Sequence, residues 1–130
     1  MNAKDLGLLI LRVGIGLIFV YHGYPKLAGG QEKWLWLGNQ MMHVGITFAP
    51  TFWGLMAAIA ECVGGVLLIL GLATRLAAFL MADVMIVALL MHWNVGDPFS
   101  VYSHPLSLLV VFVSLLVSGA GRYSLDAFLR

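Results

Sequence analysis

Charged residues are scarce in this sequence. Asp, Glu, Lys and Arg make up 10% of the 130 residues, whereas soluble domains carry about a quarter. Hydrophobic residues make up 62%, a share that excludes an ordinary soluble domain and indicates a membrane protein in contact with the lipid bilayer. The net charge is only +1 and no Lys/Arg run is present, so a nucleic-acid partner is not expected.

Cysteine and cofactor motifs are also scarce. The single cysteine, Cys62, has no partner in the sequence for a disulfide or a CxxC metal site, and we interpret it as a small buried residue. No HxxxH or HxxE spacing places two metal ligands on one helix, so no metal is predicted. Flavin, haem and nicotinamide fingerprints are missing as well. Any redox cofactor would therefore be mobile, such as a quinone, or belong to a partner.

Long hydrophobic runs, by contrast, dominate the chain. A bilayer core about 30 Å thick requires about 20 apolar residues of helix. The sequence predicts an all-α, integral membrane four-helix bundle that forms a single domain over residues 1–130. We expect the first run to be retained rather than cleaved, because Arg12 interrupts it and no small-residue cleavage site follows. The predicted spans are 6–26, 52–72, 76–93 and 100–120.

The connections between these spans predict the topology. "GLATRL" joins the second and third spans as a helical hairpin closed by Gly71. In the longest connection, residues 27–51, apolar residues recur every three or four positions, which predicts a short interfacial helix between the first and second spans. More Lys and Arg residues lie on the side of the chain ends than on the opposite side, which predicts that both termini are cytoplasmic.

Three ionisable residues fall inside the predicted spans: Arg12, Glu61 and Asp83. Each is costly in hydrocarbon and is usually turned inward and paired. Arg12 and Asp83 lie about 10 Å and 11 Å from the cytoplasmic ends of their helices, so we predict a structural ion pair between them, with Glu61 as the alternative partner of Arg12. Glu61 lies nearer the bilayer midplane, among small residues that leave room either for another helix or for a ligand.

Polar residues also gather toward the outer ends of the first and third spans. His22 and His92 are expected at a similar depth in the membrane, and Lys26 lies one helical turn beyond His22. We predict that His22 faces inward above Glu61 and opposite His92, while Lys26 extends toward water. The four residues are candidates for a proton path or a ligand site. The alternative is that the histidines are interfacial groups hydrogen-bonded to water or to loop carbonyls.

The order of several motifs resembles the DoxX family of small four-helix membrane proteins. The motifs are "LRVGIGLIFVYHGYPKL", "AECVGGVLLILGLATRLAA", a histidine that closes the third span, and "GAGRYSLD" after the fourth. Besides the candidates named above, the matched family positions are Gly23, Gly64, Gly65, Thr74, Arg75, Gly119, Gly121, Arg122, Tyr123, Ser124 and Asp126.

The resemblance implies an inner-membrane protein with a redox association. The leading hypothesis is a quinone-interacting subunit of a membrane oxidoreductase system, without a cofactor of its own and with no catalytic residue assigned. A larger membrane redox complex and a homo-oligomer are the expected partners. One alternative is a non-catalytic scaffold or assembly factor for a larger complex. Another is a small transporter or metal-handling protein.

Overall fold

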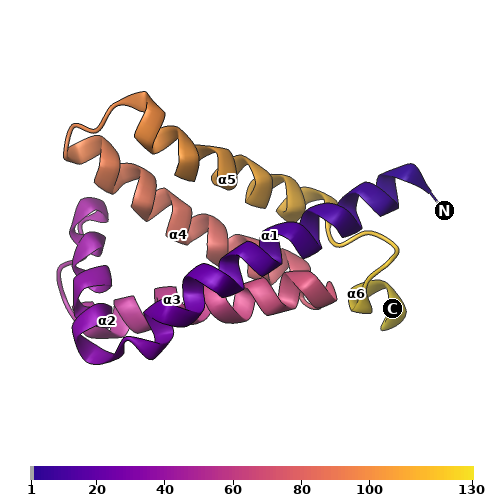
Figure 1. Ribbon diagram of the computed structural model, residues 1–130, viewed down its shortest axis with the longest axis horizontal. Coiled ribbons are helices and arrows are strands. Elements are labelled where there is room, and N and C mark those ends of the chain that lie inside the picture. The colour runs from indigo at the N-terminus through magenta and orange to yellow at the C-terminus, as the bar shows by residue number, and fades with distance from the viewer. Residues whose placement is uncertain (1) are drawn as a thin grey trace.

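The computed structural model describes residues 2–130, which form helices joined by short loops (Figure 1). Four of these helices are long and apolar enough to cross a membrane, and each overlaps one predicted span. The all-α prediction is confirmed, as is a short helix between the first and second spans. The elements are α1 (Ala3–Ala28), α2 (Gly30–Asn39), the 3₁₀ helix η1 (Gln40–Val44), α3 (Pro50–Leu70), α4 (Thr74–Asn94), α5 (Phe99–Ser118) and α6 (Leu125–Phe128).

The ends of the spanning helices follow from local sequence signals. Asn2 caps α1 by accepting a hydrogen bond from the Lys4 amide at 2.8 Å. Gly71 ends α3 in the left-handed conformation (φ 68°), and α4 begins three residues later, so the predicted hairpin between them is confirmed. Gly119 ends α5 at a positive φ of 75°, as expected for a glycine that stops a helix.

Helices α1 and α3 approach each other closely through glycines. A Cβ atom on Gly16 would lie 2.6 Å from the Gly65 carbonyl oxygen, and a Cβ atom on Gly23 would lie 2.6 Å from the Cys62 amide nitrogen. Neither contact leaves room for a side chain. Small residues therefore let the two backbones touch, as they do in many membrane-helix pairs.

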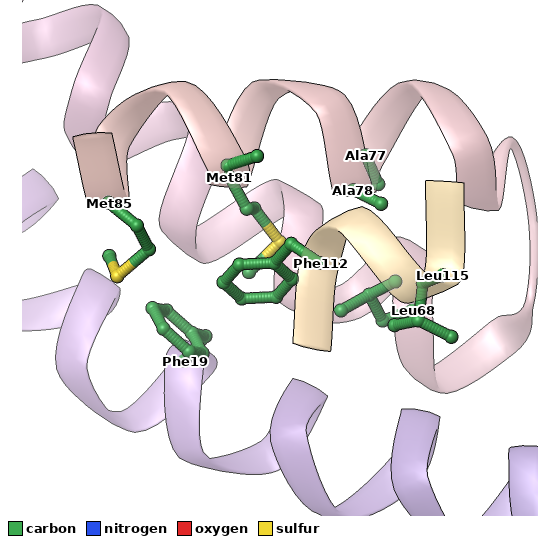
Figure 2. Packing of buried hydrophobic residues seen from close by; sticks show 9 residues of the cluster. Phe19, Leu68, Ala77, Ala78, Met81, Met85, Phe112 and Leu115 are labelled. Carbon is green, nitrogen blue, oxygen red and sulfur yellow. The ribbon is translucent and has the colours of Figure 1, made fainter. Parts of the chain in front are cut away.

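An apolar core joins the four spans (Figure 2). Phe19 of α1 packs edge-to-face on Phe112 of α5, with ring centroids 5.2 Å apart. Met81 of α4 points into the same cluster, and Ala77 and Ala78 keep α4 close to its neighbours. These contacts fix how the spans are rotated and hence which of their polar residues face inward.

Helix α2 and η1 lie at one end of the bundle, and both chain ends lie at the other (Figure 1). We call these ends the α2 side and the terminal side. Helix α2 packs on the start of α3, where Gly54 meets the Trp34 backbone and Gly38 meets the Pro50 backbone. On η1, His43 lies 2.9 Å from the Asn94 side chain at the end of α4. The segment thus connects the first three spans at this side.

Candidate functional site

A partly buried ion pair joins α1 to α3. The Lys26 ammonium donates a hydrogen bond of 2.8 Å to Oε2 of Glu61, whose side chain is 5% exposed, against 30% for the Lys26 side chain. Glu61 lies about 16 Å along α3 from Pro50 and about 14 Å from Leu70, close to the middle of that helix. The pair therefore lies at a depth where hydrocarbon would surround an unpaired charge.

The rotation of α1 explains why Lys26 reaches Glu61. The buried residues of α1 are Arg12, Gly16, Phe19 and Gly23, which follow one another at steps of three or four. Lys26 comes three residues after Gly23 and continues this stripe. Trp34 of α2 then donates its indole N–H to the Lys26 carbonyl at 3.1 Å, which ties the end of α1 to the helix that follows.

His22 does not face inward, and that prediction is wrong. Its side chain is exposed and lies edge-to-face against Tyr21, with ring centroids 5.5 Å apart. At about 100° per residue, His22 is about 80° from Arg12 around the helix, whereas Lys26 is only about 40° away. The close contact of Gly23 with α3 leaves His22 at the edge of the packed face. Lys26 therefore occupies the inward position that was predicted for the histidine.

His92 does not hydrogen-bond to Glu61 or His22 either. Its Nδ1 lies 2.7 Å from Oδ2 of Asp97, in the loop that leads to α5. Of the four ligand or proton-path candidates, the structure joins Lys26 and Glu61 and holds His92 in a separate interaction at the α2 side. Among residues 2–130, no three His, Cys, Asp or Glu side chains are close enough to hold a metal ion.

The predicted ion pair between Arg12 and Asp83 is not formed. Arg12 is fully buried and donates to the carbonyls of Leu68, at 2.9 Å, and of Tyr123, at 2.6 Å. Asp83 is exposed on α4, with no salt-bridge partner among residues 2–130. The buried face of α4 includes Met81, from which Asp83 is about 160° removed around the helix, so equal depth did not bring the two charges together.

The acidic residue that interacts electrostatically with Arg12 is Asp126 of the C-terminal segment, although the two form no salt bridge within residues 2–130. Asp126 accepts hydrogen bonds from the amides of Ala73, at 2.7 Å, and Thr74, at 3.0 Å, and its own amide donates to the Gly71 carbonyl at 2.9 Å. Burial raises the pKa of Asp126, but these amides, the Thr74 side chain and the Arg12 charge together lower it below its ordinary value.

The tail motif therefore has a structural role. Ser124 caps α6 by accepting from the Ala127 amide at 3.1 Å, and Tyr123 presents its carbonyl to Arg12. Together with Asp126 they fasten the C-terminal segment over the α3–α4 turn. The sequence did contain a signal for this role, namely the "SLD" tripeptide after a glycine break. Its serine can cap a short helix, and its acidic residue can reach the start of another helix.

The remaining family positions lie in two places. Gly64 and Gly65 lie on the inner face of α3, where a Cβ atom on Gly64 would lie 2.9 Å from the Met81 sulfur. Arg75, Gly119, Gly121 and Arg122 line a hollow at the terminal side. A second hollow of about 550 Å³, lined by Pro25, Lys33 and Trp36 among others, lies at the corner between α1 and α2.

The DoxX family model matches residues 7–93, more than half of the chain. The chain belongs to the DoxX family. It is 32% identical over 125 residues to the Bacillus subtilis protein named "Putative oxidoreductase CatD", an alignment that covers 95% of this chain and 87% of that protein. It is 27% identical over 132 residues to the Escherichia coli "Inner membrane protein YqjF", covering 98% and 95% of the two chains. The four apolar helices and this second relative support an integral inner-membrane protein.

Proposed function

We propose that this DoxX-family protein binds a lipid-soluble quinone at Lys26 and Glu61 as a membrane subunit of an oxidoreductase system. The observation that carries the proposal is the Lys26–Glu61 pair of 2.8 Å near the middle of α3. An ionised pair at this depth is expensive to maintain and marks a functional-site hypothesis. The name of the CatD relative supports the redox association.

The chemistry of the pair suits a quinone. The Lys26 ammonium has three donors, and only one is used by Glu61, so another can donate to a quinone carbonyl. Reduction of a quinone to a quinol takes up two electrons and two protons. Glu61 would pass the protons, because carboxyl groups serve as general acids and bases. The electrons would come from a partner that carries its own redox cofactor.

We further propose that both termini are cytoplasmic, so that the Lys26–Glu61 pair is reached from the membrane and from the outer, α2 side. The distribution of Lys and Arg residues supports this orientation. A cysteine placed at Lys4, in a Cys62→Ala background, would be labelled by a membrane-impermeant maleimide only after the inner face is opened. Labelling of this cysteine in intact spheroplasts would show that the termini lie on the outer side, opposite to the proposed orientation.

Quinone binding can be measured with the full-length protein in nanodiscs. Quinones quench tryptophan fluorescence, and Trp34 is hydrogen-bonded to the Lys26 carbonyl. We expect ubiquinone or menaquinone to quench the wild type, with the quenched component lost in Trp34→Phe and retained in Trp93→Phe. Lys26→Met and Glu61→Gln should each weaken binding at least about tenfold, as loss of a hydrogen bond to a charged group predicts.

Lys33→Met is the matched control for Lys26→Met, because Lys33 is an exposed lysine on α2 whose ammonium lies over the Trp36 ring, 5.9 Å from its centroid. It should leave quinone binding unchanged. Absence of binding across both quinone classes, or equal effects of the two lysine variants, would refute the proposal.

A scaffold or assembly factor is the second candidate function. It is favoured by the fact that the buried charges have partners within the chain. Glu61 is paired with Lys26, and two of the three guanidinium nitrogens of Arg12 donate to the Leu68 and Tyr123 carbonyls. An apolar double replacement, Lys26→Met with Glu61→Leu, separates the two functions, because well-packed apolar residues can replace a buried ion pair without loss of stability. A scaffold would retain its partners in this double variant, whereas a quinone site would lose its ligand.

A further inference from the structure

A hollow of about 650 Å³ lies at the terminal side, between the start of α4, the end of α5 and the C-terminal segment. Three arginines line it: Arg75, Arg122 and Arg130. They come from separate parts of the sequence and are brought together by the fold. Arg75 is held against Gly119, where a Cβ atom would lie 3.3 Å from its Nε, and it donates a long hydrogen bond of 3.4 Å to the Val117 carbonyl.

The acidic residues of the hollow do not neutralise these arginines. Asp5 accepts a hydrogen bond from the Arg122 backbone amide at 3.2 Å, and Asp126 is held by the amides at the start of α4. Within residues 2–130, no carboxylate lies within salt-bridge distance of the guanidinium groups of the three arginines. Apart from the long bond of Arg75 to the Val117 carbonyl, the side chains of these arginines make no hydrogen bond within residues 2–130, which leaves donors available for an anionic ligand.

We propose that this hollow binds the phosphate group of an anionic ligand through Arg75, Arg122 and Arg130. Guanidinium groups bind phosphate oxygens in bidentate geometry, and basic pockets between membrane helices hold lipid headgroups. The inference is independent of the proposed quinone site, which is formed by Lys26 near the α2-side end of α1 and by Glu61 near the middle of α3. The same phosphate chemistry can be offered by a phospholipid headgroup or by a soluble phosphate.

The surroundings of the hollow favour the lipid source. Leu76 lines it and is 58% exposed, and Val117, whose carbonyl binds Arg75, is 75% exposed. Both lie in the terminal turns of helices that are apolar enough to cross a membrane, next to the expected headgroup region, where exposed apolar side chains can contact acyl chains. A phospholipid could place its phosphate among the arginines while its tails lie along these residues. A soluble phosphate would gain nothing from them.

The test is lipid binding to the purified full-length protein in detergent, measured by native mass spectrometry. The probes are short-chain phosphatidylglycerol, short-chain phosphatidylcholine and inorganic phosphate. Each change of one arginine to glutamine should weaken phosphatidylglycerol binding about fivefold, and the triple variant about a hundredfold. The control is Lys4→Gln, because Lys4 is an exposed cation at the same side of the bundle that does not line the hollow. It should change binding less than about twofold.

The arms of the experiment separate the two sources. Tight binding of phosphatidylglycerol with weak competition by inorganic phosphate identifies a lipid site, whereas equal affinity for both identifies a soluble phosphate at the same arginines. The proposal is overturned if the triple variant, with unchanged helical content by circular dichroism, keeps full affinity for both probes. It is also overturned if Lys4→Gln weakens binding as much as each arginine change, because binding would then follow only the general charge of the surface.

Discussion

Replacing Gly23 by alanine tests whether the contact between α1 and α3 controls the stability of the bundle. The added Cβ atom would lie 2.6 Å from the Cys62 amide nitrogen and 2.9 Å from its Cα atom. Both neighbours are backbone atoms of a helix, so they cannot move aside as a flexible side chain can. The helices must separate by several tenths of an ångström, and overpacking of this kind costs about 1–3 kcal/mol.

Gly14 provides the matched control for Gly23. It lies in the same helix, but a Cβ atom there would have nothing within 4 Å. Gly14→Ala should therefore gain the helix propensity of alanine, about 1 kcal/mol relative to glycine in soluble helices. Since Gly23→Ala gains the same propensity, the difference between the two variants isolates the packing cost.

The free energy of unfolding can be measured by titrating the protein from mild detergent into SDS and following helix content by circular dichroism. We expect Gly23→Ala to be less stable than Gly14→Ala by about 1–3 kcal/mol. Separation of the helices would also lengthen the Lys26–Glu61 hydrogen bond one turn away. If the two alanine variants were equally stable, the close approach of α1 and α3 would not be a stabilising contact and the explanation for the positions of Lys26 and His22 would fail.

Three further predictions concern the other charged residues. Arg12→Met should lower the free energy of unfolding in the SDS titration by about 2–4 kcal/mol, because the Leu68 and Tyr123 carbonyls lose their donor, and equal stability would contradict this. Asp83→Leu should leave the stability unchanged or raise it in the same assay, because Asp83 is exposed and unpaired within residues 2–130; a loss would reveal a partner. The lowered pKa of Asp126 means that its contribution is present above the ordinary carboxyl range and is lost as the pH falls through and below about 4. Asp126→Asn should therefore destabilise the protein by about 1–2 kcal/mol at pH 7, with the difference from wild type shrinking at low pH in thermal melts; a difference independent of pH would contradict the assignment.

The spans could be predicted from the sequence because their signals are local. Hydrophobic length identifies each helix, and the glycines at 71 and 119 mark two of their ends. Predicting which residues pair with the charged side chains also requires the rotation of each helix about its axis. The sequence gives the position of Arg12 and Asp83 along their helices, but equal depth alone does not bring two side chains to the same interface.

The contacts of the C-terminal segment could not be predicted from the sequence either. Asp126 is 52 residues from Thr74 in the sequence, and its hydrogen bond to the Thr74 amide depends on where the chain turns after Gly119. The motif "RYSLD" indicated that the tail was important, yet its individual residues carry no signal for a buried arginine on the first helix as partner. Such a contact is set by the packing of three separate segments.

Rotation and close approach are linked in α1. Gly16 and Gly23 are seven residues apart, so they lie on nearly the same face of the helix, about 20° from each other. Two close backbone contacts on one face allow little rotation of α1 against α3. This constraint places Arg12 toward the α3–α4 turn at one end and Lys26 toward Glu61 at the other. The glycines of α1 therefore position both inward-facing cations, and a change that rotates α1 should disturb the Arg12 cluster and the Lys26–Glu61 pair together.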